Sequence, residues 1–195
     1  MNIKAIRKTG YSAIATLLLT GTLIASPPST GASTTVSADA SAWNFREEAS
    51  DLLAQVQVLS GKLRVDSDTL ASFTRSNLSS QSHATRLNLV RDHINQIGDK
   101  LARLQEIRHV TSPWQQRAIE QVVPVAAQMA AHTQAAIEHL NENQGYLFAP
   151  AYQDHLEAVA EHADTMSTIL AKFLDLGNTQ QKLQRLQQDL EMVES

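Results

Sequence analysis

The sequence contains no cysteine and only 5% aromatic residues, and both shortages restrict what this 195-residue chain can be. Without cysteine it can form no disulfide framework, carry no lipoprotein anchor and attach no covalent c-type haem. An exported domain made from this chain must therefore be stable through packing alone. Strand signals are also scarce, because aromatic and β-branched residues nowhere alternate with polar ones over a sustained run.

The sequence has no excess of positive charge, which argues against a general nucleic-acid binder. The whole chain carries 16 Lys and Arg against 20 Asp and Glu, a formal net charge of −4. Leaving out residues 1–40 removes Lys4, Arg7, Lys8 and Asp39, so the remainder has 13 basic against 19 acidic residues and a charge of −6. We therefore expect no nucleic-acid partner.

The first 40 residues have the pattern of an export signal. Basic side chains near the N-terminus precede an apolar run over residues 12–25, which is shorter than the roughly 20 residues that span a bilayer. Two small-residue cleavage motifs follow, so we expect the mature chain to begin at Asp39 or Ser41. The alternative is an uncleaved anchor with a flexible tether. We expect an exported protein, periplasmic or secreted, with no stable membrane span after cleavage.

The rest of the chain has the apolar period of helices. Apolar residues recur at alternating four- and three-residue spacing over residues 45–73, 87–104, 119–140 and 152–173. Asp66 is the one polar interruption in the first of these seams. Ser112, Pro113 and Gln115 have the spacing of a helix start with a capping box. Pro124 lies inside the third seam and predicts a kink there, because the apolar period continues on both sides of it.

Short polar connections between these segments force neighbouring helices to be antiparallel. The sequence therefore predicts an all-α, up-down-up-down four-helix bundle over residues 41–178, with the fourth helix ending near Gly177 and Asn178. The alternative is an extended stack of helical hairpins that becomes compact only as an oligomer. Residues 179–195 keep helical spacing in a shifted phase and predict a short C-terminal helical tail. This tail either covers its own bundle or projects and pairs with another chain.

Four of the seven histidines occupy a repeated position on the third and fourth helices. His132 and His139 are seven residues apart, as are His155 and His162, and each directly precedes a seam residue. The register that aligns the two apolar seams predicts that His139 lies beside His155 and that His132 lies beside His162. The two pairs would be about 10 Å apart along the bundle, which is too far for one ion to contact both.

Each predicted histidine pair offers two neutral nitrogen ligands. Zn²⁺ or Cu²⁺ would need further ligands from water, a carboxylate or another helix. Ordinary structural imidazoles are the simpler interpretation of His132, His139, His155 and His162. A third interpretation is a pH response, in which paired imidazoles become charged below about pH 6 and repel each other.

Motifs for catalysis are not found in the sequence, which has no Gly-rich phosphate loop, Gly-x-Ser-x-Gly elbow or His-Glu-x-x-His helix. We therefore expect a protein that is not an enzyme. The main hypothesis is an exported helical bundle that acts through its surfaces, as an envelope or secreted interaction or structural module. A homo-oligomer or a protein partner would use residues 179–195. The competing hypothesis is a periplasmic Zn- or Cu-binding bundle that uses the histidine cluster.

Overall fold

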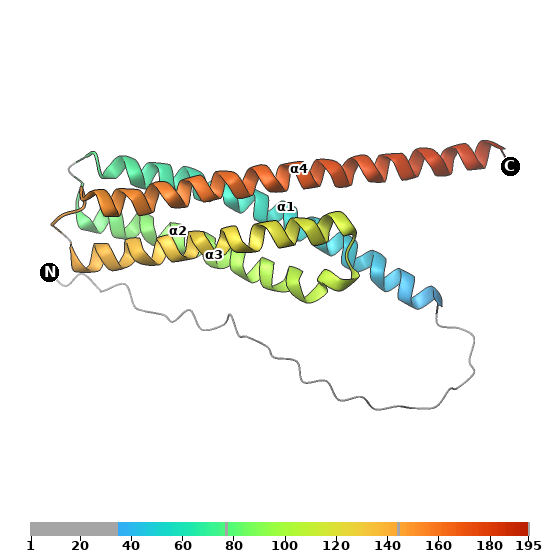
Figure 1. The fold of residues 1–195 in the computed structure, drawn as a ribbon, viewed down its shortest axis with the longest axis horizontal. Helices are drawn as coiled ribbons and strands as arrows, with labels where there is room; N and C mark the ends of the chain where they lie inside the picture. Colours follow the sequence, from blue (N-terminus) through green and yellow to red (C-terminus); the bar gives the residue numbers. More distant parts are fainter. Residues whose placement is uncertain (1–34, 77, 144, 195) are drawn as a thin grey trace, which may run out of the picture.

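A computed structural model describes residues 35–76, 78–143 and 145–194 of the chain, with side chains from Asn44 to Val193. Within these residues it forms four α-helices that pack against one another, as the sequence predicts (Figure 1). They are α1 (Thr35–Phe73), α2 (Ser80–Ile107), α3 (Pro113–Glu142) and α4 (Pro150–Glu194), with a short 3-10 helix η1 (Arg108–Val110) before α3.

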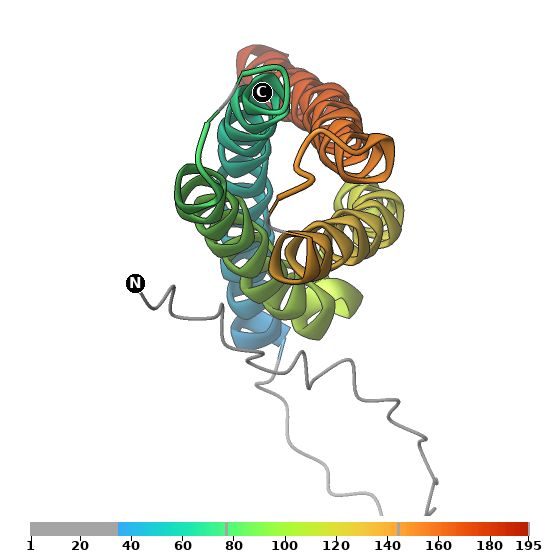
Figure 2. The same cartoon turned by 90° about the vertical axis from the view of Figure 1, so that its left-hand side faces the viewer.

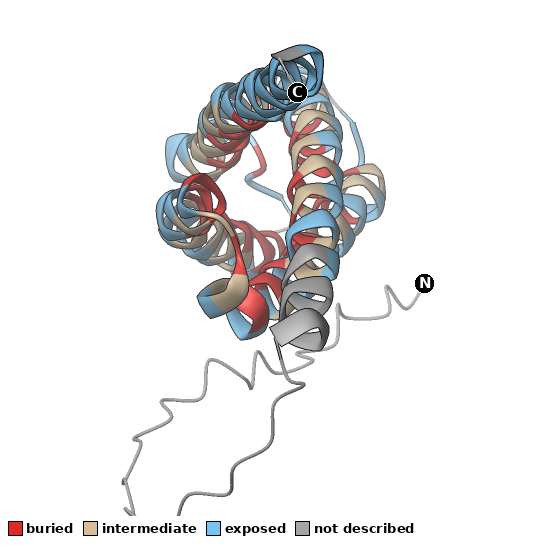
Figure 3. Cartoon of the chain, turned by 90° about the vertical axis from the view of Figure 1, so that its right-hand side faces the viewer, coloured by how far each residue is buried: buried red, intermediate tan, exposed pale blue. Residues whose placement is uncertain are grey.

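The four helices form a ring in which neighbours in sequence are neighbours in space (Figure 2). α1 packs on α2 and α4, and α3 packs on the other sides of the same two helices. Each helix turns its buried residues toward the centre (Figure 3). The largest side chains with almost no exposed surface come from all four helices: Leu53, Leu63, Leu70, Leu87, Ile97, Leu104, Ile119, Met129, Tyr152, Leu156, Met166 and Leu170.

The predicted start of α3 is confirmed, and it also ties α3 to α1. The backbone N–H of Ser112 donates to the side-chain oxygen of Gln115 at 2.8 Å. The side-chain nitrogen of Gln115 donates to the backbone oxygen of Arg46 at 2.6 Å and to Oγ of Ser50 at 2.9 Å. α3 then continues through Pro124, because the loss of one backbone donor does not outweigh an apolar face that is buried on both sides.

Asp66, the polar interruption in the first seam, is a link between α1 and α2. Arg86 donates to one of its carboxylate oxygens at 2.7 Å. The other oxygen lies 3.2 Å from Nδ1 of His93. Asp66 is only 15% exposed, so its charge is stabilised mainly by the guanidinium of Arg86 rather than by water.

The first described helix begins before the expected start of the mature chain. α1 begins at Thr35, so the expected cleavage sites before Asp39 and Ser41 lie within its first turns. Residues 1–34, which carry most of the expected export signal, lie outside the described residues, and export remains a prediction. Among the helices that the structure describes, none is long and apolar enough to cross a membrane.

The predicted end of the fourth helix at Gly177 and Asn178 is wrong, because α4 continues to Glu194. Gly177 is a packing residue and not a helix stop. A Cβ atom added at Gly177 would lie 2.5 Å from Cζ2 and 2.7 Å from Cε2 of the Trp114 indole on α3. Only glycine leaves room for that ring, so the helix passes beneath it and the tail extends beyond α2 and α3 (Figure 1).

Candidate functional site

The histidines of α3 and α4 form a row of half-buried rings with His132 at its centre. Nδ1 of His132 lies 3.3 Å from Nδ1 of His155, which is hydrogen-bond distance. The ring centroid of His132 is 5.5 Å from that of His155 and 5.6 Å from that of His162. His132 therefore lies between the two imidazoles of α4. A hydrogen bond between two imidazoles needs one ring that accepts, so the His132–His155 pair is most stable with at least one neutral ring.

The ring of His139 contacts Tyr152 and the connection before α4. It stacks on Tyr152, with centroids 5.3 Å apart and planes 20° apart, and its Nε2 lies 3.3 Å from the backbone oxygen of Tyr146. His139 also lies near His155, as predicted, since its charge lowers the pKa of His155, but the hydrogen bond of His155 is with His132. The predicted contact of His132 with His162 is confirmed, but it belongs to a row of three rings and not to an isolated pair.

The difference comes from the register of the α3–α4 hairpin. The connection between the two helices is residues 143–149, so the hairpin is centred on residue 146. Two contacts agree with this centre, those of Trp114 with Gly177 and of His139 with Tyr152. The predicted register was centred on residue 147 to 148, and the contact of His132 with His162 agrees with it. His132 also contacts His155, seven residues before His162 on α4, so its ring lies between these two histidines.

A second set of rings, one from each helix, extends the row toward the loop end. Nδ1 of His83 on α2 lies 3.2 Å from the hydroxyl oxygen of Tyr152 on α4. Phe73 of α1 packs edge-on against His83, and His139 of α3 stacks on Tyr152. The seam position of His83 predicts a core histidine, and it is buried. Its partner Tyr152 was not predicted, because their contact depends on the packing of helices distant in sequence.

Burial sets the protonation of these rings. It lowers the pKa of His83, and a hydrogen bond with the backbone of Phe73 opposes this effect in part. Burial also lowers the pKa of His155; the charges of His132 and His139 lower it further, while that of Asp154 raises it. Burial raises the pKa of the Tyr152 hydroxyl. His83 and His155 therefore stay neutral to lower pH than a histidine in water.

Neutral imidazoles are metal ligands, but the row does not supply a complete coordination shell. Within the described ranges, no group of three or more His, Cys, Asp or Glu side chains is placed to hold one metal ion. Among the described histidines of α3 and α4, the ring nitrogens within hydrogen-bond distance of each other are the Nδ1 atoms of His132 and His155. The arrangement can therefore offer two nitrogen ligands or respond to protonation.

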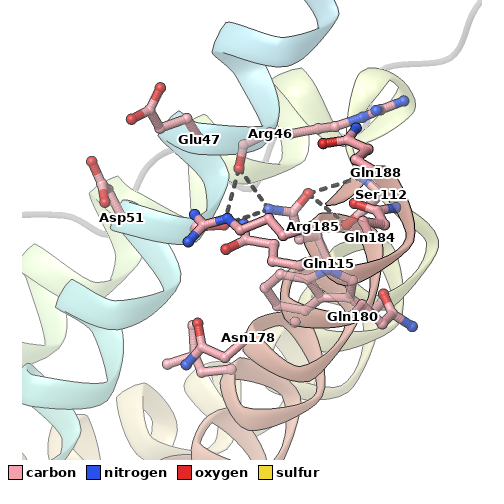
Figure 4. Close-up of a pocket in the computed structure, with 15 residues that line it drawn as sticks. Arg46, Glu47, Asp51, Ser112, Gln115, Asn178, Gln180, Gln184, Arg185 and Gln188 are labelled. Carbon is pink, nitrogen blue, oxygen red and sulfur yellow. Dashed lines mark hydrogen bonds between the residues drawn. The ribbon is translucent and has the colours of Figure 1, made fainter. Parts of the chain in front are cut away.

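A cleft of about 550 Å³ lies at the other end of the bundle, between residues 46–51 of α1, residues 112–115 at the start of α3, and residues 174–188 of α4 (Figure 4). Amide and charged side chains dominate its lining. The residues that line it are Arg46, Glu47, Ser50, Asp51, Ser112, Trp114, Gln115, Leu174, Gly177, Asn178, Gln180, Gln181, Gln184, Arg185 and Gln188. This set contains no histidine or cysteine.

Beyond Gly177, α4 has a polar side toward the cleft and an apolar side away from it. Gln181, Gln184 and Gln188 line the cleft. Leu183, Leu186 and Leu190 each follow one of these glutamines by two residues, which is about 200° around a helix. We define the outer stripe as five exposed apolar residues: Leu176 (42% exposed), Leu183 (55%), Leu186 (58%), Leu190 (64%) and Val193 (84%).

The histidine row, the cleft and the outer stripe are the three features of the described residues that could carry a function. The row is half-buried and the cleft is lined mostly by residues with polar side chains, whereas the stripe is apolar and exposed. Comparisons with protein-family models, with curated proteins and with solved structures give no match to this chain.

Proposed function

We propose that this protein is an exported, non-enzymatic interaction module, in which the bundle holds out the α4 tail so that its outer stripe pairs with a helix of another chain. The observation that carries the proposal is the exposure of the outer stripe while the opposite, cleft-facing side of the same helix is rich in glutamine. Export rests on the sequence pattern of residues 1–40.

The length and spacing of the tail support helix pairing. Residues 178–194 extend about 25 Å at 1.5 Å per residue. The outer stripe repeats at seven-residue intervals, which is the spacing of a coiled-coil seam. A continuous apolar surface on a protein in water is typical of an interaction site. Pairing with another helix would bury these apolar side chains and remove them from water.

A photo-reactive amino acid in place of Leu186 is expected to form a covalent adduct with another protein chain in cells that make the full chain. The same substitution at Gln184, on the cleft side of the helix, is the matched control and is expected to give no adduct between chains. The adducts are measured by their mass on denaturing gels. If neither Leu186 nor Leu190 gives an adduct, the proposed function is wrong.

Deletion of residues 179–195 is expected to remove the interaction and leave the bundle folded. The described side chains from Thr179 to Val193 are all exposed, so their loss removes almost no buried apolar surface. The melting temperature, measured by circular dichroism, should change by no more than about 2 °C, which corresponds to less than about 1 kcal/mol. A large decrease would show that the tail stabilises its own bundle instead.

A second candidate function is Zn²⁺ or Cu²⁺ binding by the histidine row, and one distance favours it. Two nitrogen ligands on a tetrahedral ion with bonds of about 2.0–2.1 Å are about 3.3–3.4 Å apart. The Nδ1 atoms of His132 and His155 are 3.3 Å apart. These two side chains would hold the ion and water would complete its coordination. Half-burial of both rings limits their motion and reduces the entropy lost on binding.

Titration with Zn²⁺ or Cu²⁺ is expected to raise the melting temperature, by an amount equivalent to about 2.7 kcal/mol when free metal is 100-fold above its dissociation constant. His132→Gln and His155→Gln should each remove the effect. His139→Gln should retain it, because His139 stacks on Tyr152 and its Nε2 lies beside the backbone oxygen of Tyr146. Equal calorimetric heats for the wild type and His132→Gln would contradict metal binding at this site.

A further inference from the structure

We infer that the partner of the outer stripe is the outer stripe of a second copy of this chain, aligned antiparallel. This inference rests on the proposed function, because it names the helix with which the tail pairs. Leu176, Leu183 and Leu190 are seven residues apart, and Leu186 and Val193 repeat that interval three residues later. Residues with this spacing occupy the two core positions of a heptad, so the stripe can form one continuous seam.

An antiparallel alignment brings nearly every core residue of one tail opposite an apolar residue of the other. The layers are Leu176 with Val193, Thr179 with Leu190, and Leu183 with Leu186, and each occurs twice. The overlap covers residues 176–193, about 27 Å of helix. A surface that complements itself about a two-fold axis is what a closed symmetric dimer requires. The outer stripe therefore matches its own copy along its full length.

The charges beside the seam favour this orientation. Lys182 directly precedes Leu183, and Asp189 directly precedes Leu190, so both flank the seam on the same edge. In the antiparallel alignment, Lys182 of each copy lies beside Asp189 of the other, which gives two pairs of opposite charge. In a parallel pair, Lys182 would instead lie beside the neutral Gln187 five residues further along the second copy. The charge pattern thus selects the antiparallel dimer.

These charges and the stripe are available to a second copy. Lys182 and Asp189 are exposed, and neither forms an ion pair within the described part of the chain. The stripe lies on the side of α4 opposite the cleft, so a second tail can approach without displacing α1. The antiparallel arrangement also places the two bundles at opposite ends of the paired tails.

Charge reversal tests the pairing of Lys182 with Asp189. Either Lys182→Asp or Asp189→Lys creates two pairs of like charge, so the dimer dissociation constant of the full chain should rise about tenfold at low salt. The double variant restores opposite charges and should return it to near the wild-type value. Lys172→Asp, outside the overlap, is the matched control. Sedimentation equilibrium measures all four, and a dimer that is indifferent to these reversals overturns the antiparallel alignment.

Disulfide trapping tests the orientation directly, because the chain has no cysteine of its own. A mixture of Leu176→Cys and Val193→Cys chains should form a disulfide between the two variants. Val193→Cys alone should not, because the two copies of that position lie about 25 Å apart along the antiparallel pair. A disulfide from Val193→Cys alone would overturn the inference in favour of a parallel dimer.

The experiments distinguish failure of the proposed function from failure of the dimer inference. If the full chain is a monomer while the photo-reactive group at position 186 captures a different protein, the second copy is the wrong partner and the proposed function stands. If the chain is a monomer and position 186 captures nothing, both are overturned. A dimer that dissociates on deletion of residues 179–195 and responds to the charge reversals supports both.

Discussion

Gly177→Ala is expected to destabilise the bundle by about 1–2 kcal/mol, although alanine is the better helix former. The new Cβ atom would stand 2.5 Å from Cζ2 of Trp114, far inside van der Waals contact. The indole is a rigid ring and only 9% exposed, so it cannot move aside without disturbing its neighbours. Overpacking of this kind costs about 1–3 kcal/mol, and the gain in helix propensity returns only about 1 kcal/mol.

Gly98→Ala is the matched control, and its expected effect has the opposite sign. Gly98 is exposed within α2, and an added Cβ there would meet nothing within 4 Å. That substitution should stabilise the protein by about 0.5–1 kcal/mol. Urea unfolding followed by circular dichroism measures both free energies of unfolding. If Gly177→Ala stabilises the protein as much as Gly98→Ala does, the described packing of Trp114 is wrong.

Acidification from pH 7 to pH 5 is expected to lower the free energy of unfolding. Burial lowers the pKa of His83 and of His155 in the folded protein, whereas both return to the ordinary value of 6.5 on unfolding. The unfolded chain therefore takes up protons first as the pH falls below 6.5, and stability decreases until the lowered folded pKa values are passed. Each histidine contributes a slope of at most about 1.4 kcal/mol per pH unit.

The decrease in stability on acidification can be assigned to individual histidines by substitution. Melting temperatures between pH 5 and pH 8 should vary less for His155→Gln than for the wild type. His109→Gln, at an exposed position in η1, is the control and should leave the variation unchanged. The pKa of Glu48, lowered by its hydrogen bond with Arg103, affects stability only below about pH 4.5 and so lies outside this range. Stability that increases on acidification would contradict the assignment.

The elements of the fold could be predicted because their signals are local. A seam of apolar residues at four- and three-residue spacing identifies a helix without reference to the rest of the chain. The capping box at Ser112 and Gln115 and the passage of α3 through Pro124 were predictable for the same reason. The predicted end of the fourth helix at Gly177 is wrong because it depends on a contact between distant residues. Glycine often follows the last turn of a helix, but here it accommodates Trp114, which lies 63 positions earlier in the chain.

The candidate sites could be predicted only in part. The seven-residue spacing of the histidines of α3 and α4 indicates that they gather on one side of this helix pair, and the structure places them there. Which rings touch depends on register, and the sequence did not predict that His155 bonds to His132 or that His139 stacks on Tyr152. The length of the connection over residues 143–149 limits that register, and Leu147 within it is buried. No local pattern encodes this length.

The sequence by itself determined that this chain is all-α, that it forms four antiparallel helices, and that its last residues continue with helical spacing in a different phase. Periodicity is enough for these conclusions because a helix must bury its apolar side. Only the tertiary structure decided that α4 is unbroken, that His132 lies between two other imidazoles, and that the outer stripe points away from the bundle. These features depend on the relative rotation and translation of packed helices, which are set by contacts between residues far apart in the chain.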